Sequence, residues 1–273
     1  MNYKQRISFV GAGSMTEALM SGMLQEGLFA PGQITVTNHS DQERLMFLNE
    51  RYNVCTTYDM KGLIEQATII ILAIKPKDVT DGVKRIAQYI NENHLVISVL
   101  AGISTNKITS LIGKNVAVIR AMPNTSATIG KSATALSKGE FAEDEHLEIA
   151  KTLFETVGIV TTVEEQDLHA VTGLSGSGPA YVYYLVEAME RAASEVGLDQ
   201  AVAKDLILQT IIGAAEMLKS SSKQPSTLRK EVTSPGGTTE AGIKVLEEFN
   251  YQDAMVSCIK RATARSTELG SSL

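Results

Sequence analysis

Short apolar runs rich in β-branched residues alternate with longer amphipathic segments in the first part of the chain. Strands are expected at Ile7–Val10, Ile34–Thr37, Ile69–Ile74, Leu95–Val99 and Val116–Ile119, with further ones at Ala133–Leu136 and Ile159–Thr162. Apolar residues at three- and four-residue spacing predict helices over Met15–Gln25, Gln42–Glu50, Val79–Ile90, Asn106–Ile112 and Asp144–Thr156. This alternation predicts βαβ units and an α/β fold with a doubly wound, Rossmann-type parallel sheet.

The pattern changes after Glu164, where the β-branched runs end. Helices are expected over Ala180–Val196, Ala201–Leu218, Thr239–Phe249 and Ala254–Leu269. We therefore predict a Rossmann domain over residues 1–165 and an all-α domain over residues 166–273. A helical domain of this size has a large surface for its volume, so we expect it to bury one face against a second subunit in a homo-oligomer.

Charge and composition narrow the classes of partner. The 25 Lys and Arg residues against 31 Asp and Glu residues give a net charge of −6, which argues against nucleic acid and acidic membrane surfaces. No apolar stretch approaches the roughly 20 residues of a membrane span. The apolar run near the N-terminus stops at Gly11 and predicts a strand rather than a signal peptide, so we expect a soluble, cytoplasmic protein. Cys55 and Cys258 lack metal-ligand spacing, so both are expected to be reduced and buried, and no metal site is expected.

A glycine-rich loop connects the first expected strand to the first expected helix. It reads Gly11-Ala12-Gly13-Ser14-Met15, a setting in which a dinucleotide pyrophosphate can bind at the helix N-terminus. Thr16 departs from the pattern, because a smaller residue usually stands there to let helix and strand pack closely. The alternative is a simple turn between strand and helix.

The end of the second strand bears on the choice of cofactor. It reads Asn38-His39-Ser40, without the carboxylate that NAD enzymes place on the ribose hydroxyl at this point, although Asp41 follows. These side chains can donate hydrogen bonds to a 2′-phosphate, and Arg44 is a candidate charge partner. We therefore expect NADPH, with NADH as the less favoured alternative. For His39 the alternative is an ordinary exposed loop residue.

A second glycine-rich segment, Ser234-Pro235-Gly236-Gly237-Thr238-Thr239, lies far along the chain from the first. Gly236 and Gly237 allow consecutive backbone N–H groups to converge on one point, as in an anion-binding nest. A small carboxylate suits such a nest. The alternative is a helix N-terminus that Thr238 or Thr239 caps without any ligand.

Three more segments, at residues 73–76, 120–125 and 172–181, are rich in glycine, proline and hydroxyl side chains. Loops of this kind beyond the ends of parallel strands form the ligand crevice of doubly wound sheets, so Lys75 and Asn124 are expected to border the nicotinamide. The most specific motifs of the chain are Met122-Pro123-Asn124-Thr125, Leu174-Ser175-Gly176-Ser177-Gly178-Pro179-Ala180, Leu208-Gln209-Thr210 and Val232-Thr233 leading into the segment at Ser234. In this order, over nearly the whole chain, they resemble pyrroline-5-carboxylate reductase, which makes L-proline from a cyclic imine with NADPH.

The resemblance implies a role for individual residues. Cofactor-binding residues would be Gly11, Ala12, Gly13, Ser14, Met15, Asn38, His39, Ser40, Ala73, Lys75, Pro76 and Asn124. Substrate-binding residues would be Ser175, Ser234, Gly236, Gly237, Thr238 and Thr239, with the catalytic Thr239 hydroxyl on the ring nitrogen. It also implies a dimer with intertwined C-terminal helices. Ser14, Thr16, Ser126 and His39 depart from the residues usual in the family, which bears on cofactor affinity and preference.

Imine reduction can proceed without a strong acid or base, because the substrate can arrive protonated and mainly needs orienting. The glycine-rich segments accordingly hold no histidine, and we expect His94, His146 and His169 to be surface or supporting residues.

Two other functions are compatible with a Rossmann domain followed by helices. A 6-phosphogluconate-type or hydroxyacid dehydrogenase needs a base, commonly a lysine one turn after a glycine-rich loop, and the helix after Gly178 has none there. A cofactor-binding sensor without turnover is the second, although the intact Thr238-Thr239 pair argues against it. A cyclic imine of another ring size is a further alternative substrate.

Overall fold

The computed structural model describes residues 5–271. The chain divides into two compact units. The first unit comprises the residues up to Pro179 together with those from Lys260 onward, and the second comprises Ala180–Ile259. The domain boundary that the sequence places between residues 165 and 166 stays a prediction.

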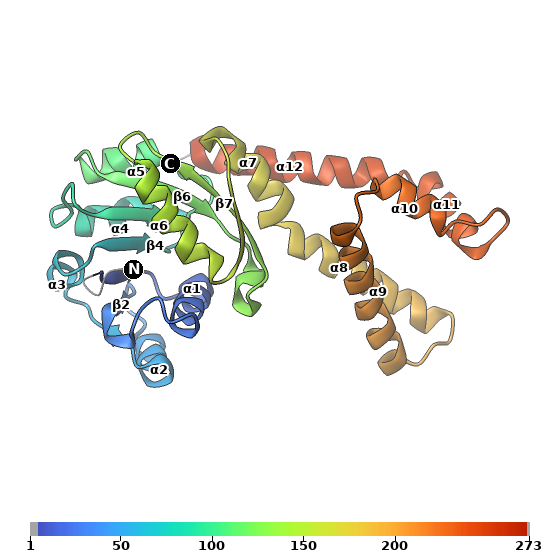
Figure 1. Cartoon of the computed structure of the whole chain (residues 1–273), viewed down its shortest axis with the longest axis horizontal. Coiled ribbons are helices and arrows are strands. Elements are labelled where there is room, and N and C mark those ends of the chain that lie inside the picture. Colours follow the sequence, from blue (N-terminus) through green and yellow to red (C-terminus); the bar gives the residue numbers. More distant parts are fainter. Residues whose placement is uncertain (1–4, 272–273) are drawn as a thin grey trace. The chain divides into compact units, whose positions relative to one another are not determined.

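The first unit is built on an 8-stranded sheet with the order β3-β2-β1-β4-β5-β6-β7-β8 (Figure 1). Its strands are β1 (Ile7–Val10), β2 (Ile34–Thr37), β3 (Cys55–Thr56), β4 (Ile69–Leu72), β5 (Leu95–Ser98), β6 (Ala117–Met122), β7 (Ser132–Lys138) and β8 (Gly158–Thr162). Strands β1 to β6 pair in parallel, β7 runs antiparallel to β6, and β8 pairs in parallel with β7. The predicted doubly wound parallel sheet is confirmed, and the last two expected strands extend it.

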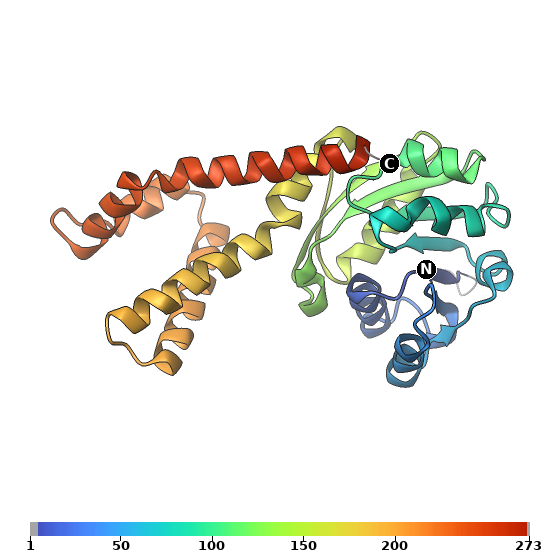
Figure 2. The ribbon, with the colours of Figure 1, turned by 180° about the vertical axis from the view of Figure 1, so that it is seen from behind.

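Helices cover both faces of this sheet (Figures 1 and 2). One face carries α1 (Ser14–Gln25), α2 (Gln42–Tyr52) and α6 (Asp144–Glu155), and the other carries α3 (Met60–Glu65), α4 (Val79–Ala87) and α5 (Thr105–Ile112). Side chains of β4 alternate between the two cores, with Ile69 and Ile71 in one and Ile70 and Leu72 in the other. A strand buried on both faces needs a continuous apolar run, which is why β4 reads Ile-Ile-Ile-Leu.

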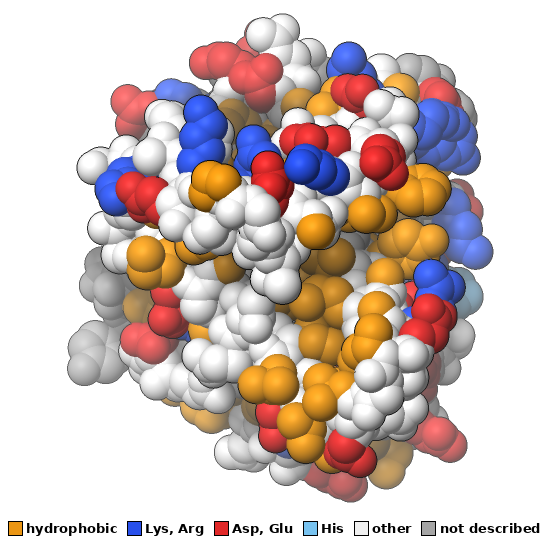
Figure 3. All heavy atoms as spheres, turned by 90° about the vertical axis from the view of Figure 1, so that its right-hand side faces the viewer, with side chains coloured by type: hydrophobic (Ala, Val, Ile, Leu, Met, Phe, Trp, Pro, Cys, Tyr) orange, Lys and Arg blue, Asp and Glu red, His pale blue; other side chains and the backbone are white. Residues whose placement is uncertain are grey.

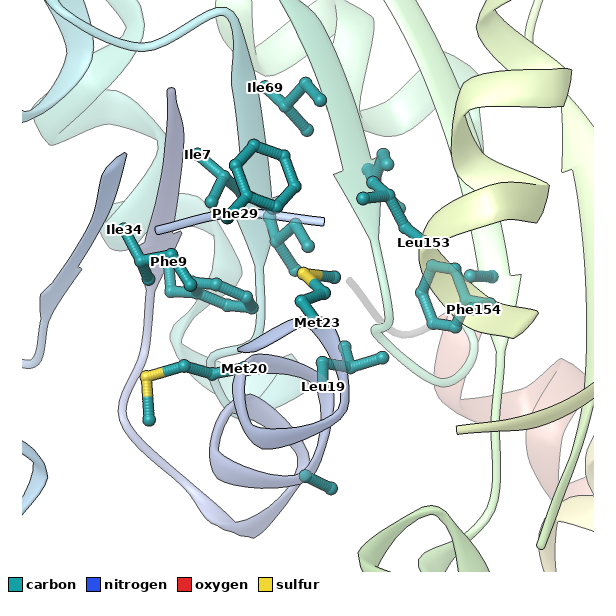
Figure 4. Close-up of a cluster of buried hydrophobic side chains, with 14 of the residues drawn as sticks. Ile7, Phe9, Leu19, Met20, Met23, Phe29, Ile34, Ile69, Leu153 and Phe154 are labelled. Atoms are coloured by element: carbon teal, nitrogen blue, oxygen red, sulfur yellow. The ribbon is translucent and has the colours of Figure 1, made fainter. Parts of the chain in front are cut away.

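The larger core lies between the sheet and the helices α1, α2 and α6 (Figure 4). Phe9 from β1, Met20 and Met23 from α1, and Phe154 from α6 point into it and are fully buried. This packing fixes the direction of α1, and therefore the position of the glycine-rich loop that precedes α1.

The second unit is helical, as predicted. From Gly178 onward the α-helices are α8 (Gly178–Glu195), α9 (Gln200–Ser220), α10 (Pro225–Glu231), α11 (Thr238–Glu248) and α12 (Tyr251–Ser271). The unit division falls inside α8 and α12. Large apolar side chains are exposed here, Tyr184 to 77%, Leu206 to 56% and Ile212 to 49%, and apolar side chains gather on the face that Figure 3 shows. A face of this kind is typical of a contact with another protein chain.

The structure corrects the expected burial of the cysteines. Cys55 and Cys258 are free thiols but both are exposed, Cys55 because it lies on the short edge strand β3. His94 is a supporting residue rather than a surface one, since it is only 4% exposed. Its Nδ1 accepts a hydrogen bond from the Asn91 amide at 2.9 Å, and its Nε2 donates to the Ile64 carbonyl at 3.1 Å.

Two properties of residues 5–271 bear on the expected partners. None of the helices there combines the length and the apolar character that crossing a bilayer requires. The same residues hold no group of three or more His, Cys, Asp or Glu side chains placed to bind a metal ion.

Candidate functional site

The residues expected to bind the cofactor gather at one edge of the sheet. Gly11–Met15 follow β1, Asn38–Ser40 follow β2, Ala73–Pro76 follow β4 and Asn124 follows β6. Because these strands are parallel, their carboxyl ends lie at the same edge, which is where doubly wound sheets bind ligands.

Gly11 lies where the loops after β1, β2 and β4 meet. Its amide donates to the Thr37 carbonyl at 2.9 Å, and its φ of +120° lies in the region that favours glycine. A Cβ at Gly11 would overlap the carbonyl oxygen of Ala73. The glycine therefore allows these three loops to approach one another as closely as they do.

Thr16 and Gly13 complete the loop. Thr16 is fully buried and its Oγ1 donates to the Gly11 carbonyl at 2.8 Å, so the departure from a small residue braces the turn instead of opening it. Gly13 is the N-cap of α1, and no side chain caps that end. The first amides of α1 are therefore available to an anion, which the helix dipole also favours.

In the loop after β2, the one carboxylate has a structural role. Asp41 is the N-cap of α2, and its Oδ1 accepts from the Arg44 amide at 2.9 Å. The Asn38 side chain donates to the Asp41 carbonyl at 2.6 Å and accepts from its amide at 3.0 Å. His39 and Ser40 are exposed and hydrogen-bonded to each other at 3.2 Å.

The Arg44 side chain reaches back to the glycine-rich loop. Its Nε donates to the Ala12 carbonyl at 2.8 Å and its Nη2 to the Glu17 carboxylate at 2.5 Å, and the Tyr52 hydroxyl donates to the same carboxylate at 2.8 Å. Partial burial raises the pKa of Glu17, but the hydrogen bonds from Arg44 and Tyr52 outweigh it, so the pKa is lowered overall. The sequence alone does not predict this role of Glu17, since no local pattern links a residue of α1 to one of α2.

Asn124 joins the end of β6 to the segment that precedes α8. Its Nδ2 donates to the Ser175 carbonyl at 3.1 Å, while its Oδ1 accepts from the Ser126 amide at 3.1 Å. Ser175 lies in the turn Thr172–Gly176, which adopts π-helical geometry after α7 (Leu168–Val171). One expected cofactor residue and one expected substrate residue are thus in contact within the first unit. Lys75 is exposed, just ahead of the turn that begins at Pro76.

The first residue of the segment 120–125 is a buried arginine to which the sequence pattern assigns no role. Arg120 of β6 is 1% exposed, and its Nη1 donates to Glu165 at 3.3 Å, while its Nε and Nη2 have no hydrogen-bond partner among the described residues. The Glu165 carboxylate also accepts from the Thr105 amide at 2.7 Å and hydroxyl at 2.6 Å. This network fixes β6 against the start of α5.

The segment from Ser234 to Thr239 belongs to the second unit. Gly236 has a φ of +73°, and the Gly237 amide donates to the Ser234 carbonyl at 3.0 Å. Helix α11 begins at Thr238 with Gly237 as N-cap, and no side chain caps it, so neither threonine has the capping role of the alternative interpretation. Both threonines are exposed. The Gly236 amide donates to the Glu240 carboxylate at 2.7 Å, so this loop already binds a carboxylate group.

Comparisons with known proteins agree over both units. The family model described as pyrroline-5-carboxylate reductase dimerisation matches residues 165–269, and the one described as NADP oxidoreductase coenzyme F420-dependent matches residues 6–102. Pyrroline-5-carboxylate reductase 2 of Bacillus subtilis is 51% identical over 265 residues, 97% of this chain and 95% of the relative. The pyrroline-5-carboxylate reductase of Synechocystis is 38% identical over 97% of this chain and 98% of the relative.

Solved structures show the same relationship. The structure of a pyrroline-5-carboxylate reductase from Coxiella burnetii superposes with a TM-score of 0.88 at 35% identity, covering 97% of this chain and 98% of that one. Plasmodium falciparum pyrroline carboxylate reductase with NADP bound superposes with a TM-score of 0.90 at 25% identity, covering 99% of this chain and 100% of that one. The resemblance inferred from the sequence motifs is confirmed: the chain belongs to the pyrroline-5-carboxylate reductase family.

Proposed function

We propose that this chain reduces 1-pyrroline-5-carboxylate to L-proline with NADPH as the hydride donor. The observation that carries the proposal is the close approach of the end of β2 and the loop after β4 to Gly11, in a chain that matches a relative of this family over 97% of its length. An enzyme of this kind needs a dinucleotide held at a sheet edge and a carboxylate held by separate donors, and the chain has residues suited to each task.

The cofactor is assigned to the sheet edge. Gly11–Met15 and the N-terminus of α1 take the pyrophosphate, since the amides there have no side-chain cap. Asn38, His39 and Ser40 face the 2′-phosphate, and NADPH is preferred because Asp41 is committed to capping α2. Ala73, Lys75 and Pro76 run beside the cofactor, and Asn124 borders the nicotinamide. When bound, NADPH supplies the hydride.

The substrate is assigned to hydroxyls and backbone amides. Ser234, Gly236, Gly237 and Thr238 take the substrate carboxylate, in keeping with the hydrogen bond that the Gly236 amide already donates to the Glu240 carboxylate. The Thr239 hydroxyl holds the ring nitrogen. Hydride adds to the imine carbon, the C=N π electrons move to the protonated nitrogen, and the product is the neutral secondary amine, so no strong acid or base is needed.

We further infer that the protein works as a homodimer through the helices of the second unit. The matched dimerisation model spans residues 165–269, and exposed apolar residues such as Tyr184 and Leu206 occur in α8 and α9. Burying such side chains against a second copy would remove them from water.

Two variants test this assignment, because they should affect turnover and substrate binding separately from NADPH binding. Thr239→Ala should lower kcat by about ten- to a hundredfold, the effect of losing a hydrogen bond to a charged group, and should leave the Kd for NADPH unchanged. Gly237→Val should mainly raise KM for the imine, because its side chain stands where the carboxylate binds and its Cβ would lie 3.0 Å from the Ser234 carbonyl oxygen. Steady-state kinetics and NADPH titration by fluorescence measure both. An equal loss of NADPH affinity in the two variants would contradict the assignment of cofactor and substrate to separate loops.

A further inference from the structure

We propose that Arg44 contacts the 2′-phosphate of NADPH and that Glu17 is a positioning residue, which orients Arg44 and offsets part of its charge. The pair thereby sets how strongly the protein prefers NADPH over NADH. The inference rests on the proposed function, since it concerns the cofactor site assigned above.

Arg44 lies close to both loops that are assigned to the cofactor. Its backbone belongs to the first turn of α2, next to Asn38–Ser40, while its Nε donates to the carbonyl of Ala12 in the glycine-rich loop at 2.8 Å. These loops are adjacent, because the Gly11 amide donates to the Thr37 carbonyl. The guanidinium therefore lies between the pyrophosphate loop and the end of β2, which is where Rossmann folds place the adenosine ribose.

Arg44 also supplies the positive charge that a phosphate needs. The segment Asn38-His39-Ser40-Asp41-Gln42-Glu43 contains no lysine or arginine, so Arg44 is the first such residue after β2. A guanidinium has more N–H donors than its bonds to Ala12 and Glu17 use, and Nη1 makes no hydrogen bond with the described residues. The side chain is 26% exposed and packs over the Phe47 ring at 5.2 Å, so its open donors are held in a fixed direction. Planar guanidinium groups suit phosphate well.

Glu17 lies against the guanidinium of Arg44. Its carboxylate is 2.5 Å from Nη2 of Arg44 and 3.8 Å from Arg51, it also accepts from Tyr52, and it is 22% exposed. A partly buried negative charge this close offsets much of the attraction between Arg44 and a phosphate. The charge of Glu17 thus makes the preference for NADPH weaker than Arg44 alone would give. Neutralising that charge while keeping a side chain that can still accept a hydrogen bond from Arg44 should strengthen the preference.

A pair of small nucleotides tests this without any turnover. Adenosine 2′,5′-bisphosphate and adenosine 5′-monophosphate differ only in the 2′-phosphate, and their Kd values can be measured on the full chain by calorimetry. Arg44→Met should weaken the bisphosphate about tenfold or more and change the monophosphate less than about twofold. Glu17→Gln should increase the ratio of the two affinities by about three- to tenfold in favour of the bisphosphate.

Arg51→Met is the matched control. It removes an equal charge from the same helix and also lies near Glu17, but its side chain is 59% exposed, so the affinity ratio should stay within about twofold of the wild type. Arg44→Lys keeps the charge and should show an intermediate ratio, which provides the test if Arg44→Met does not fold.

Three outcomes would overturn the proposal. If Arg44→Met weakens both nucleotides equally, Arg44 only braces the glycine-rich loop. If Glu17→Gln leaves the affinity ratio unchanged, Glu17 does not set the preference. If Arg51→Met shifts the affinity ratio as much as Arg44→Met, the ratio depends on the net charge of α2 and not on the position of Arg44. Failure of the wild type to bind either nucleotide would instead contradict the cofactor assignment itself, which distinguishes the two proposals.

Discussion

Gly11 and Gly13 stand in the same loop but face different constraints. Gly11 has a φ of +120° and no room for a Cβ beside Ala73, whereas Gly13 has a φ of −77°, and the space that a Cβ would take there is open. Without cofactor, Gly11→Ala should lower the free energy of unfolding by about 2 kcal/mol or more, and Gly13→Ala by less than about 1 kcal/mol. Urea unfolding of both variants measures the difference. Equal losses would contradict the structural distinction between the two glycines.

The same variants should respond differently to NADPH. Gly13→Ala places a methyl group at the uncapped N-terminus of α1, where the pyrophosphate is proposed to sit, so NADPH should bind about tenfold or more weakly although the empty protein stays stable. Fluorescence titration gives the Kd. Undiminished binding in Gly13→Ala would show that the cofactor does not approach the loop backbone here.

At the scale of elements, His169 links α7 to the end of α12. Its Nδ1 is 3.0 Å from the Ser266 hydroxyl, and burial, together with the positive charge of Arg120, lowers its pKa although Glu165 opposes the shift. A lowered folded-state pKa means that the unfolded chain binds the proton more readily. The stability from neutral His169 is therefore complete above the ordinary pKa of about 6.5 and is lost as the pH falls from there toward the lower folded-state value.

The replacement His169→Asn tests this link. The fall of Tm between about pH 7.5 and about pH 5 should be smaller in the variant than in the wild type, because the variant has no proton to gain at this position. Thermal unfolding followed by circular dichroism over this pH range measures both proteins. Parallel Tm curves would show that His169 does not contribute to the pH dependence of stability.

At the scale of the whole molecule, the helices of the second unit leave apolar side chains in water. Leu206 on α9 is 56% exposed in the single chain, so a glutamate at this position should change the stability of the monomer little. In a dimer that covers this position, the carboxylate would be buried without a positively charged partner. Leu206→Glu should raise the dissociation constant of the homodimer by about tenfold or more. Light scattering after size-exclusion chromatography at decreasing concentration measures the mass. A wild-type protein that is already monomeric would contradict the proposed assembly.

The sequence predicted the sheet because its strands are buried on both faces and therefore appear as continuous apolar runs. It missed β3 and α3, since a strand of 2 residues and a helix of 6 are too short for periodicity to show. It found the glycine-rich loop but not the Glu17 and Arg44 pair, because only tertiary packing brings α1 and α2 together. The ion pair of the buried Arg120 with Glu165 was also not predicted, because the two residues are far apart in the sequence. The predicted burial of Cys55 was wrong because hydrophobicity does not show which strand forms the edge.

Several predictions made from the sequence are not tested by any contact within the chain. The roles of individual substrate and cofactor residues, the domain boundary after residue 165 and the cytoplasmic location stay predictions. Thr16 and His39, which both depart from the residues usual in the family, show the contrast between a residue that a contact within the chain explains and one that it does not. Thr16 is explained by its hydrogen bond to the Gly11 carbonyl, whereas His39 is exposed and its role depends on the cofactor.

The central claim is the reduction of a cyclic imine by NADPH, and one assay tests it directly. The purified protein is given racemic 1-pyrroline-5-carboxylate with NADPH, and separately with NADH, while nucleotide oxidation is followed and the product is identified by chiral chromatography. We expect imine-dependent oxidation, faster with NADPH, that yields L-proline in equal amount to the oxidised nucleotide. Nucleotide binding without imine-dependent oxidation would contradict this account and favour a cofactor-binding protein without this activity.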